Sequence, residues 1–182
     1  MNDSCRIGGA GGLVIPDLTS DGWLPPGRHP ASLEDIELIF VKRAPHADHR
    51  DLLFRTLTVY LDMVQQLLPR GSAWVDGGFC TYKDAAPHDV DITLLVPRSR
   101  AEDMAFIEQF LPLLTLKDVH AEEPVSFMSP RMQPMGGKID AFLCVAGDPA
   151  QEQYWDTVWS SVKGSDGEIV DGETKGYLEV TW

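Results

Sequence analysis

The most regular hydrophobic pattern in the chain lies in residues 48–68. Apolar side chains there recur in alternating steps of four and three, at Leu53, Leu57, Tyr60, Val64 and Leu67. This spacing places them on one face of an α-helix. The pattern stops before Pro69, so we expect a long amphipathic helix that buries one face in the core.

A shorter helix is expected to begin at Ser32. Its hydroxyl can accept a hydrogen bond from the free amides of the first turn, and Asp35 can reach back to complete a capping box. An apolar stripe follows at Leu33, Ile36, Ile39 and Phe40. Similar patterns predict helices at residues 101–114, where Pro112 shortens the last turn, and at residues 149–162.

Strands are expected where the spacing changes to strict alternation or to a short apolar run. These segments are residues 73–76, 89–96, 125–128, 138–145 and 177–182. The stretches 129–137 and 164–176 are rich in turn-forming residues and are expected to be loops. The resulting order predicts an α+β domain with one mixed sheet flanked by helices.

Length and composition fit one domain with a single core, since the chain has 182 residues and 43% of them are hydrophobic. Residues 1–23 are rich in Gly, so we expect a flexible segment there and one domain over residues 24–182. The three cysteines, at positions 5, 80 and 144, form no CxxC pair. They argue against a disulfide framework or a zinc site and fit a reducing compartment.

Acidic residues outnumber basic ones by 28 to 15, which gives a formal net charge of −13. A surface of that sign repels phosphate backbones and argues against broad nucleic-acid binding. No apolar stretch approaches the ~20 residues needed to span a bilayer, and the first residues lack the pattern of a signal peptide. We therefore expect a cytoplasmic protein without membrane contact.

Residues 77–91 are the strongest candidates for chemistry. Asp89 and Asp91 lie two apart on an expected strand, so both carboxylates project from one face. Adjacent carboxylates repel each other unless a cation lies between them, and such hard oxygen ligands suit Mg²⁺ or Mn²⁺. The amides of Gly77 and Gly78 can bind phosphate oxygens. Together these features predict metal-assisted phosphoryl or nucleotidyl transfer.

Asp140 is the candidate for a third carboxylate. It interrupts an otherwise apolar strand pattern in residues 138–145. An acid in such a strand is costly to bury unless it is paired or metal-bound. The alternative is an exposed position or a salt bridge with Lys138.

Gly-Gly, ten residues and then Asp-Val-Asp-Ile, followed by a later strand aspartate, resembles the signature of the DNA polymerase beta-like nucleotidyltransferase superfamily. The segments LPPGRHPASLEDIE, VDGGFCTYKDAAPHDVDITLLVP and KGYLEVTW look like an uncharacterised subfamily of small bacterial nucleotidyltransferase-like proteins. The resemblance covers residues 24–182 and implies a nucleotidyltransferase-like mixed sheet flanked by helices.

The resemblance also implies an enzyme that moves a nucleotidyl group from a nucleoside triphosphate, such as ATP, to an acceptor hydroxyl with two Mg²⁺ (or Mn²⁺) ions. Asp89 and Asp91 would bind both metals. Asp140 would bind one and help to deprotonate the acceptor. Gly77 and Gly78 would hold the triphosphate.

Thr81 and Lys83 can also contact the triphosphate. Many superfamily members have Ser where this chain has Gly78, so here the backbone amide alone would contact the phosphate. The alternatives without a function are a solvated strand end for Asp89 and Asp91 and a tight turn without a ligand for Gly77 and Gly78. Arg131 is expected in a loop near the third carboxylate.

Three further residue types have simpler interpretations. Cys80 is expected to be a packed side chain, and His88 a turn residue. Trp155 and Trp159, at helical spacing, are expected in the core or on a partner surface.

Two functions stay open. The first is the nucleotidyltransferase, which all three carboxylates favour and whose acceptor the acidic charge predicts to be a protein or small molecule. The second is a non-catalytic regulatory or binding module, such as an antitoxin-type partner, because minimal superfamily members often work with a partner chain in toxin–antitoxin pairs.

Overall fold

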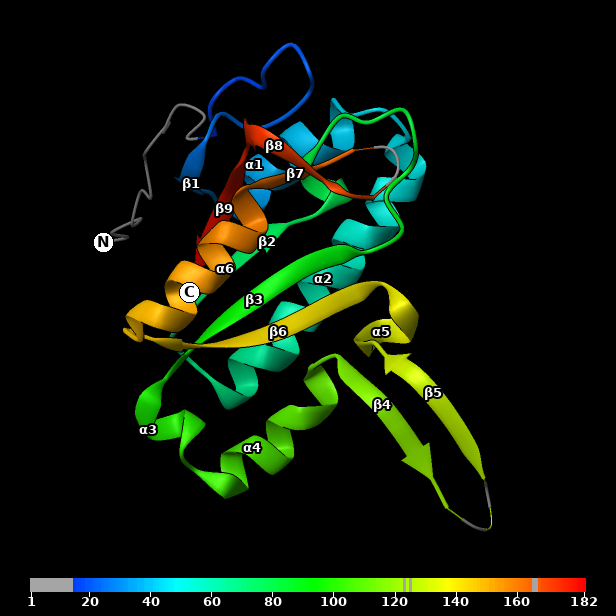
Figure 1. Ribbon diagram of the computed structural model, residues 1–182, viewed down its shortest axis with the longest axis vertical. Helices are drawn as coiled ribbons and strands as arrows, with labels where there is room; N and C mark the ends of the chain where they lie inside the picture. The colour runs from blue at the N-terminus through cyan, green and yellow to red at the C-terminus, as the bar shows by residue number, and fades with distance from the viewer. Residues whose placement is uncertain (1–14, 123, 125, 165–166) are drawn as a thin grey trace, which may run out of the picture.

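The structure is a computed structural model of the chain and describes residues 15–122, 124, 126–164 and 167–182 (Figure 1). Residues 1–14 of the segment predicted to be flexible lie outside the described residues. From Ile15 onward the chain packs onto the domain. Ile15 is buried, and the Gly22 carbonyl accepts a hydrogen bond from the Tyr82 amide at 2.8 Å.

Five strands form one mixed sheet in the order β1-β9-β2-β3-β6. They are β1 (Gly27–Pro30), β2 (Ser72–Asp76), β3 (Val90–Pro97), β6 (Ile139–Ala146) and β9 (Gly176–Thr181). β1 runs parallel to β9 and β3 parallel to β6, whereas β2 is antiparallel to both of its neighbours. Helices flank this sheet, so the predicted α+β class is confirmed.

One face of the sheet carries the main hydrophobic core. The elements on this side are α1 (Leu33–Glu37), the π-helical turn η1 (Leu38–Lys42), α2 (Ala47–Leu67) and α4 (Met104–Phe110). Val90 and Ile92 of β3 are fully buried in one cluster with Leu53 and Leu57 of α2. The long helix predicted from hydrophobic spacing is therefore confirmed, with each end shifted by one residue.

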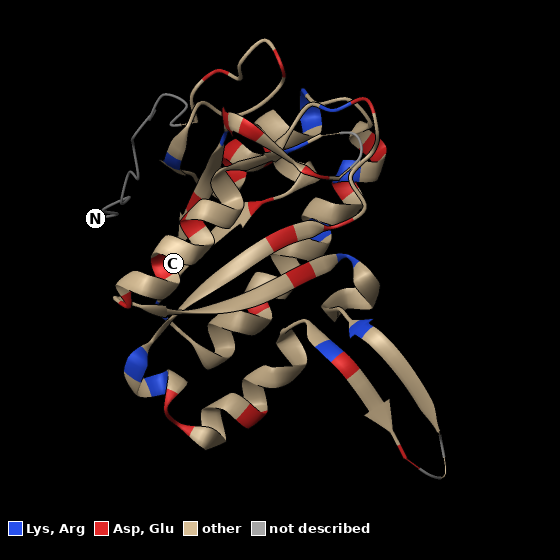
Figure 2. Ribbon diagram, in the orientation of Figure 1, with Lys and Arg blue, Asp and Glu red and all other residues tan. Residues whose placement is uncertain are grey.

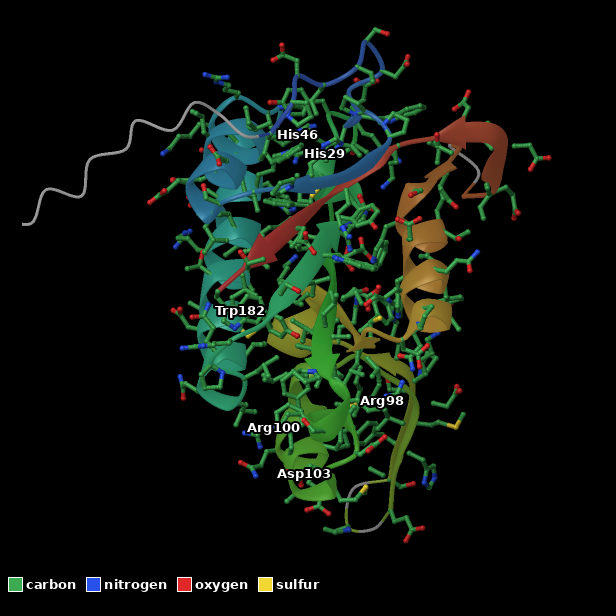
Figure 3. All side chains as sticks on the ribbon, turned by 90° about the vertical axis from the view of Figure 1, so that its left-hand side faces the viewer. His29, His46, Arg98, Arg100, Asp103 and Trp182 are labelled. Carbon is green, nitrogen blue, oxygen red and sulfur yellow. The ribbon has the colours of Figure 1, made fainter. Side chains whose placement is uncertain are left out.

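The other face is covered in part by α6 (Pro149–Ser160), which lies across the sheet from α2 in Figure 3. Trp159 of α6 packs in a second cluster with Trp74 and Tyr177 of the sheet. Its indole N–H donates to Thr93 Oγ1 at 3.0 Å. Alternate residues of β3 therefore face different layers, with Ile92 toward the main core and Thr93 toward α6.

The predicted capping box is present, because Ser32 Oγ accepts from the Asp35 amide and Asp35 accepts from the Ser32 amide. The single helix predicted for residues 101–114 is wrong. That region contains α3 (Arg98–Ala101), α4 and the 3-10 turn η3 (Leu111–Leu113). The Asp103 side chain caps a new helix by accepting from two amides of its first turn, and Pro112 lies in the 3-10 turn that ends it.

Four strands lie outside the main sheet, where the sequence predicted mainly loops. β4 (Leu116–Ala121) pairs with β5 (Phe127–Met132), and β7 (Ser161–Lys163) pairs with β8 (Ile169–Thr174). The sequence predicted a strand only at residues 125–128, of which residue 125 lies outside the described residues. β4, β5 and β8 bury little of their surface, so they lack the apolar alternation that marks a half-buried strand. The short turn α5 (Pro134–Gly137) joins β5 to β6.

Leu57→Ala tests the packing of α2 on the sheet. Leu57 is fully buried, whereas Leu52 on the same helix is 44% exposed. We expect Leu57→Ala to lower the free energy of unfolding by about 2–5 kcal/mol because it leaves a cavity. Leu52→Ala, the same chemical change, should cost less than about 1 kcal/mol. Urea unfolding measures both, and equal losses would contradict this assignment of the buried face.

Candidate functional site

Three aspartates lie in one row across neighbouring strands. Asp76 of β2 is the cross-strand partner of Asp91 of β3, and Asp91 is the partner of Asp140 of β6. Such partners project from the same face, and neighbouring strands lie ~4.8 Å apart. Figure 2 shows acidic positions side by side on β3 and β6. The row lies on the α6 face, because Asp91 alternates in step with Thr93, which contacts Trp159.

Gly77 makes the close approach between the turn and the row possible. Its backbone has φ 81° and ψ −165°, a region that glycine occupies almost alone. A Cβ on Gly77 would lie 1.8 Å from the Asp91 Oδ2 atom. The chain then continues into the 3-10 turn η2 (Gly78–Cys80). The turn therefore places its backbone directly against the Asp91 carboxylate.

Side chains from α2 hold this loop from the core side. Arg50 is fully buried, and its guanidinium donates to the carbonyl oxygens of Phe79 and Thr81, each at 2.6 Å. His49 Nε2 donates to the Pro87 carbonyl at 2.6 Å. Because these bonds are backbone-directed and largely buried, they fix the path of the loop between the glycines and the aspartates.

Asp76 has a cation on one oxygen only. Lys175 Nζ forms an ion pair with Asp76 Oδ2 and also donates to the Trp159 carbonyl at 2.7 Å. The Asp76 side chain is almost completely buried, and its Oδ1 atom has no hydrogen-bond partner among the described residues. Burial raises the pKa of Asp76, and Lys175 opposes that rise. Such an unpartnered buried oxygen is costly and marks a place where a ligand atom would be stabilising.

The carboxyl of Asp91, in the middle of the row, has a raised pKa. Burial, and then the charges of Asp89 and Asp76, raise its pKa to about 7. An ordinary aspartate has a pKa of ~3.9, so the Asp91 carboxyl keeps its proton to a higher pH than an exposed aspartate does. The nearby charges of Lys163 and Lys175 are too weak to reverse that effect. A cation bound here would favour the ionised form.

Side chains from the region before β6 hold two acids, Asp140 of the row and Asp89, which directly precedes β3. Arg131 Nη2 forms an ion pair with Asp140 Oδ2. The Thr115 hydroxyl donates to Asp140 Oδ1 at 2.7 Å. Gln133 Nε2 donates to Asp89 Oδ2 at 2.9 Å. Asp140 thus has a partner on each oxygen.

A small cavity of about 150 Å³ lies at the glycine turn. Its charged lining residues are Asp76, Lys83, Asp91, Lys163 and Lys175. Lysines outnumber acids here, although in the whole chain 28 acids face only 15 basic residues. The local excess of cations beside backbone amides suits an anionic group such as a phosphate.

A wider cavity of about 750 Å³ lies along the other part of the row. It shares Asp91, Trp159 and Lys163 with the small cavity, so the two adjoin. Its wall contains Asp140 and the exposed ring of Tyr154, 61% exposed. This space is large enough for a second, larger molecule beside the acid row.

The acid row fits a hard divalent cation by donor chemistry. It offers carboxylate oxygens, one of them buried without a partner among the described residues, and one carboxyl whose pKa is raised by burial and by neighbouring charges. Within the described ranges, however, no group of three or more His, Cys, Asp and Glu side chains is arranged to hold a metal ion. The outer acids are instead neutralised by Arg131 and Lys175.

The structure brings the predicted site residues to one cleft but gives them unequal parts. Gly77, Gly78, Thr81 and Lys83 all line the small cavity. The Thr81 hydroxyl donates to the Gly78 carbonyl at 2.9 Å, so its proton is used to hold the turn. Asp89, together with the other two predicted aspartates, lines the wide cavity.

Neither alternative interpretation of Asp140 is observed. Its side chain is buried rather than exposed, and it pairs with Arg131 of the adjacent hairpin rather than with Lys138. Arg131 itself lies in β5 rather than in a loop. Cys80 is a buried side chain as expected, and burial raises its pKa well above the usual range. Trp159 lies in the core of the α6 face.

Sequence reasoning missed several residues of this site, among them Asp76, Thr115, Gln133, Lys163 and Lys175. Only Asp76 carried a local signal. It ends the expected strand before Gly77 and alternates in step with Trp74, which places it on one face with that residue. Lys175 lies 99 residues from its partner Asp76, in a stretch without regular pattern.

The fold and the site together define an α+β domain with an acid-lined cleft on one face of its sheet. Residues 16–181 match the Family of unknown function (DUF6932), and the chain belongs to that family. No curated protein and no solved structure matches the chain. No helix in the described ranges has the length and apolar character needed to cross a membrane.

Gly77→Ala tests the contact between the turn and the row. The added Cβ would collide with the Asp91 carboxylate. The alanine would also have to adopt a backbone conformation that it rarely occupies. We expect a loss of more than about 2 kcal/mol in the free energy of unfolding. In Gly78→Ala the nearest atom, Pro87 Cβ, lies at an ordinary 3.5 Å, so the loss should stay below about 1 kcal/mol. Denaturant unfolding measures both losses. A loss for Gly77→Ala as small as that for Gly78→Ala would contradict this geometry.

Asp91→Asn tests the raised pKa of Asp91, which burial and the neighbouring carboxylates cause. The folded pKa of Asp91, about 7, lies above its unfolded value, so the folded chain binds the extra proton and stability falls as pH rises from about 4 to 7. The amide removes this penalty. We expect the gain in stability over wild type to be about 1–3 kcal/mol larger at pH 8 than at pH 5. Urea unfolding in EDTA measures it, and a pH-independent difference would contradict the raised pKa.

Proposed function

We propose that the chain is a divalent-metal-dependent nucleotidyltransferase that moves a nucleotidyl group from a nucleoside triphosphate to an acceptor hydroxyl. The observation that carries this proposal is the acid row of Asp76, Asp91 and Asp140 beside the Gly77 turn, in a cleft whose turn end is rich in lysine. The resemblance of the Gly-Gly and Asp-x-Asp segment to the DNA polymerase beta-like superfamily is consistent with the same chemistry.

The cleft suggests an order for the two substrates. The triphosphate would lie at the lysine-rich end, with its phosphate oxygens near the Gly77 and Gly78 amides and Lys83. The acceptor would lie in the wide cavity beside Asp140. The strongly acidic chain favours a protein or small-molecule acceptor over a long nucleic acid.

Asp91, the middle acid of the row, and Asp89, two residues before it, would hold Mg²⁺ or Mn²⁺. The bound ions would supply charge stabilisation for the phosphates and lower the pKa of the acceptor hydroxyl. Asp140 would accept the hydroxyl proton as the acceptor oxygen bonds to the α-phosphorus and the bond to pyrophosphate breaks. Lys83 and Lys163 would stabilise the negative charge of the leaving pyrophosphate.

A second candidate is a non-catalytic binding module of the same fold, such as an antitoxin-type partner. The observation that favours it is the ion pair between Arg131 and Asp140, which gives the third acid a partner inside the chain. Such a module would keep the cleft for a ligand but show no turnover.

Isothermal titration of Mg²⁺ with each nucleoside triphosphate tests the proposal. We expect the wild type to bind, and Asp89→Asn or Asp91→Asn to bind at least about tenfold more weakly, a difference of ~1.4 kcal/mol. Asp62→Asn, an exposed acid on α2, removes the same charge away from the cleft and should bind as wild type. Absence of binding by the wild type would overturn the proposal. Binding without transfer of label to any acceptor in cell extract would favour the second candidate.

A further inference from the structure

Two acids, Asp140 of the row and Asp89 just before β3, are held by one short stretch of chain. Arg131, in β5, pairs with Asp140, and Gln133, two residues later, donates to Asp89 at 2.9 Å. Residues two apart in an extended chain project to the same side, so both side chains turn toward the row together. Any movement of this stretch therefore changes the surroundings of both acids at once.

The two oxygens of Asp140 are held differently. Oδ1 accepts from the Thr115 hydroxyl, which itself accepts from the Ala141 amide at 2.9 Å, so Oδ1 is tied to the sheet framework. Among the described residues Oδ2 is paired only with Arg131, whose side chain is 44% exposed while that of Asp140 is 5% exposed. A half-exposed arginine can leave for solvent at low cost, whereas the buried carboxylate then needs another cation. Oδ2 is the position at which the partner can be exchanged.

The stretch that carries Arg131 is built to move. The hairpin formed by β4 and β5, which we name the arm, is a separate two-stranded sheet that extends from the body in Figure 1. Two strands alone are marginally stable in water. Met128 of the arm is 80% exposed, and Phe127 is 43% exposed, so the arm has little core of its own.

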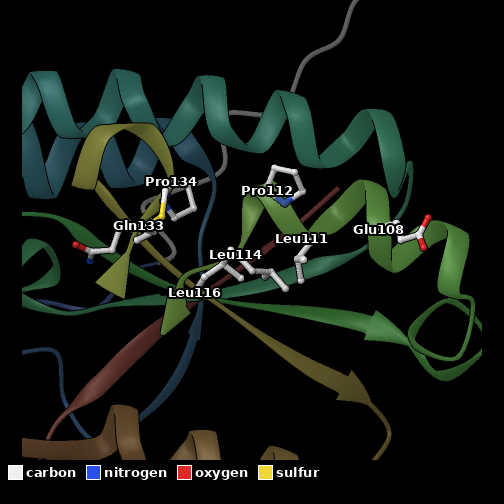
Figure 4. A pocket seen from close by; sticks show the side chains of 8 residues that line it. Glu108, Leu111, Pro112, Leu114, Leu116, Gln133 and Pro134 are labelled. Atoms are coloured by element: carbon white, nitrogen blue, oxygen red, sulfur yellow. The ribbon is translucent and has the colours of Figure 1, made fainter. Parts of the chain in front are cut away.

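The backbone and the packing at the base of the arm also favour its movement. Between β5 and β6, Met135, Gly136 and Gly137 take left-handed backbone conformations in succession, with φ of 54°, 64° and 81°. A cavity of about 360 Å³ lies under the base, lined mainly by apolar side chains such as Leu114 and Leu116. Figure 4 shows Gln133 at the rim of this cavity with its amide turned away from the leucines. The cavity leaves one side of the base without packed neighbours.

We propose that the arm is an autoinhibitory latch in which Arg131 occupies the Asp140 oxygen that a divalent cation would take. The inference rests on the proposed function, because the competing ion is the metal of that reaction. In the latched state Arg131 neutralises Asp140, and Gln133 holds Asp89. When the arm moves away, Asp89 and Asp140 are released to bind the cation together with Asp91. The metal site is then complete. The latch accounts for a row of acids that contains no ready three-ligand metal cluster among the described residues.

Mn²⁺ binding measured by isothermal titration, without nucleotide, tests the latch. We expect Arg131→Gln to bind Mn²⁺ about tenfold more tightly than wild type, within the range typical of coupling between two sites. Lys117→Gln is the matched control. Lys117 is the cross-strand neighbour of Arg131 in the arm, lines the same wide cavity and carries the same charge. Its loss changes the general field but releases neither acid, so the affinity should change by less than about twofold.

Two further measurements keep the test decisive if Arg131→Gln folds poorly. Gln133→Ala should also tighten Mn²⁺ binding, because it releases Asp89. In the wild type, saturating Mn²⁺ should speed amide hydrogen exchange in residues 127–132 as the arm is released. Equal Mn²⁺ affinities of Arg131→Gln and Lys117→Gln, with exchange unchanged, would overturn the latch while leaving the proposed function intact. If neither the wild type nor Arg131→Gln binds Mn²⁺, the proposed function and the latch both fail.

Discussion

Repulsion between carboxylates on neighbouring strands is the constraint around which this structure is organised. The register of β2, β3 and β6 places Asp76, Asp91 and Asp140 side by side, at a spacing where like charges are costly in a partly buried site. A cationic side chain pairs with the acid at each end of the row, Lys175 with Asp76 and Arg131 with Asp140. Asp91 in the middle has no ion-pair partner among the described residues, and burial, followed by the charges of Asp89 and Asp76, raises its pKa to about 7. A cation bound beside Asp91 would favour its ionised form.

The rest of the domain keeps this costly arrangement in place. The α2 face supplies the burial that stabilises the sheet, and Arg50 of α2 fixes the loop that carries the glycines. Gly77 lets that loop touch the Asp91 carboxylate, where any side chain would collide. The α6 face contributes Trp159, whose carbonyl holds Lys175. Stability is supplied on one side of the sheet, and the site is built on the other.

The sequence predicted the parts of the fold whose signal is local. The period of α2, the capping box at Ser32 and four of the five strands of the main sheet follow from spacing and side-chain chemistry within a few residues, whereas β1 was not predicted. The same spacing put Asp89 and Asp91 on one face. The pairs Asp76–Lys175 and Asp140–Arg131 were not predictable, because each joins segments that only the folded topology brings together. The arm was missed because exposed strands carry no apolar alternation.

The central claim is that the middle of the row binds a divalent cation beside a phosphate. Anomalous X-ray scattering from crystals grown with Mn²⁺ and a non-hydrolysable nucleoside triphosphate tests it most directly. The account predicts a manganese peak between the carboxylates of Asp89 and Asp91, with phosphate oxygens at the amides of Gly77 and Gly78. A row without manganese, in which only Arg131 and Lys175 neutralise the acids, would contradict it.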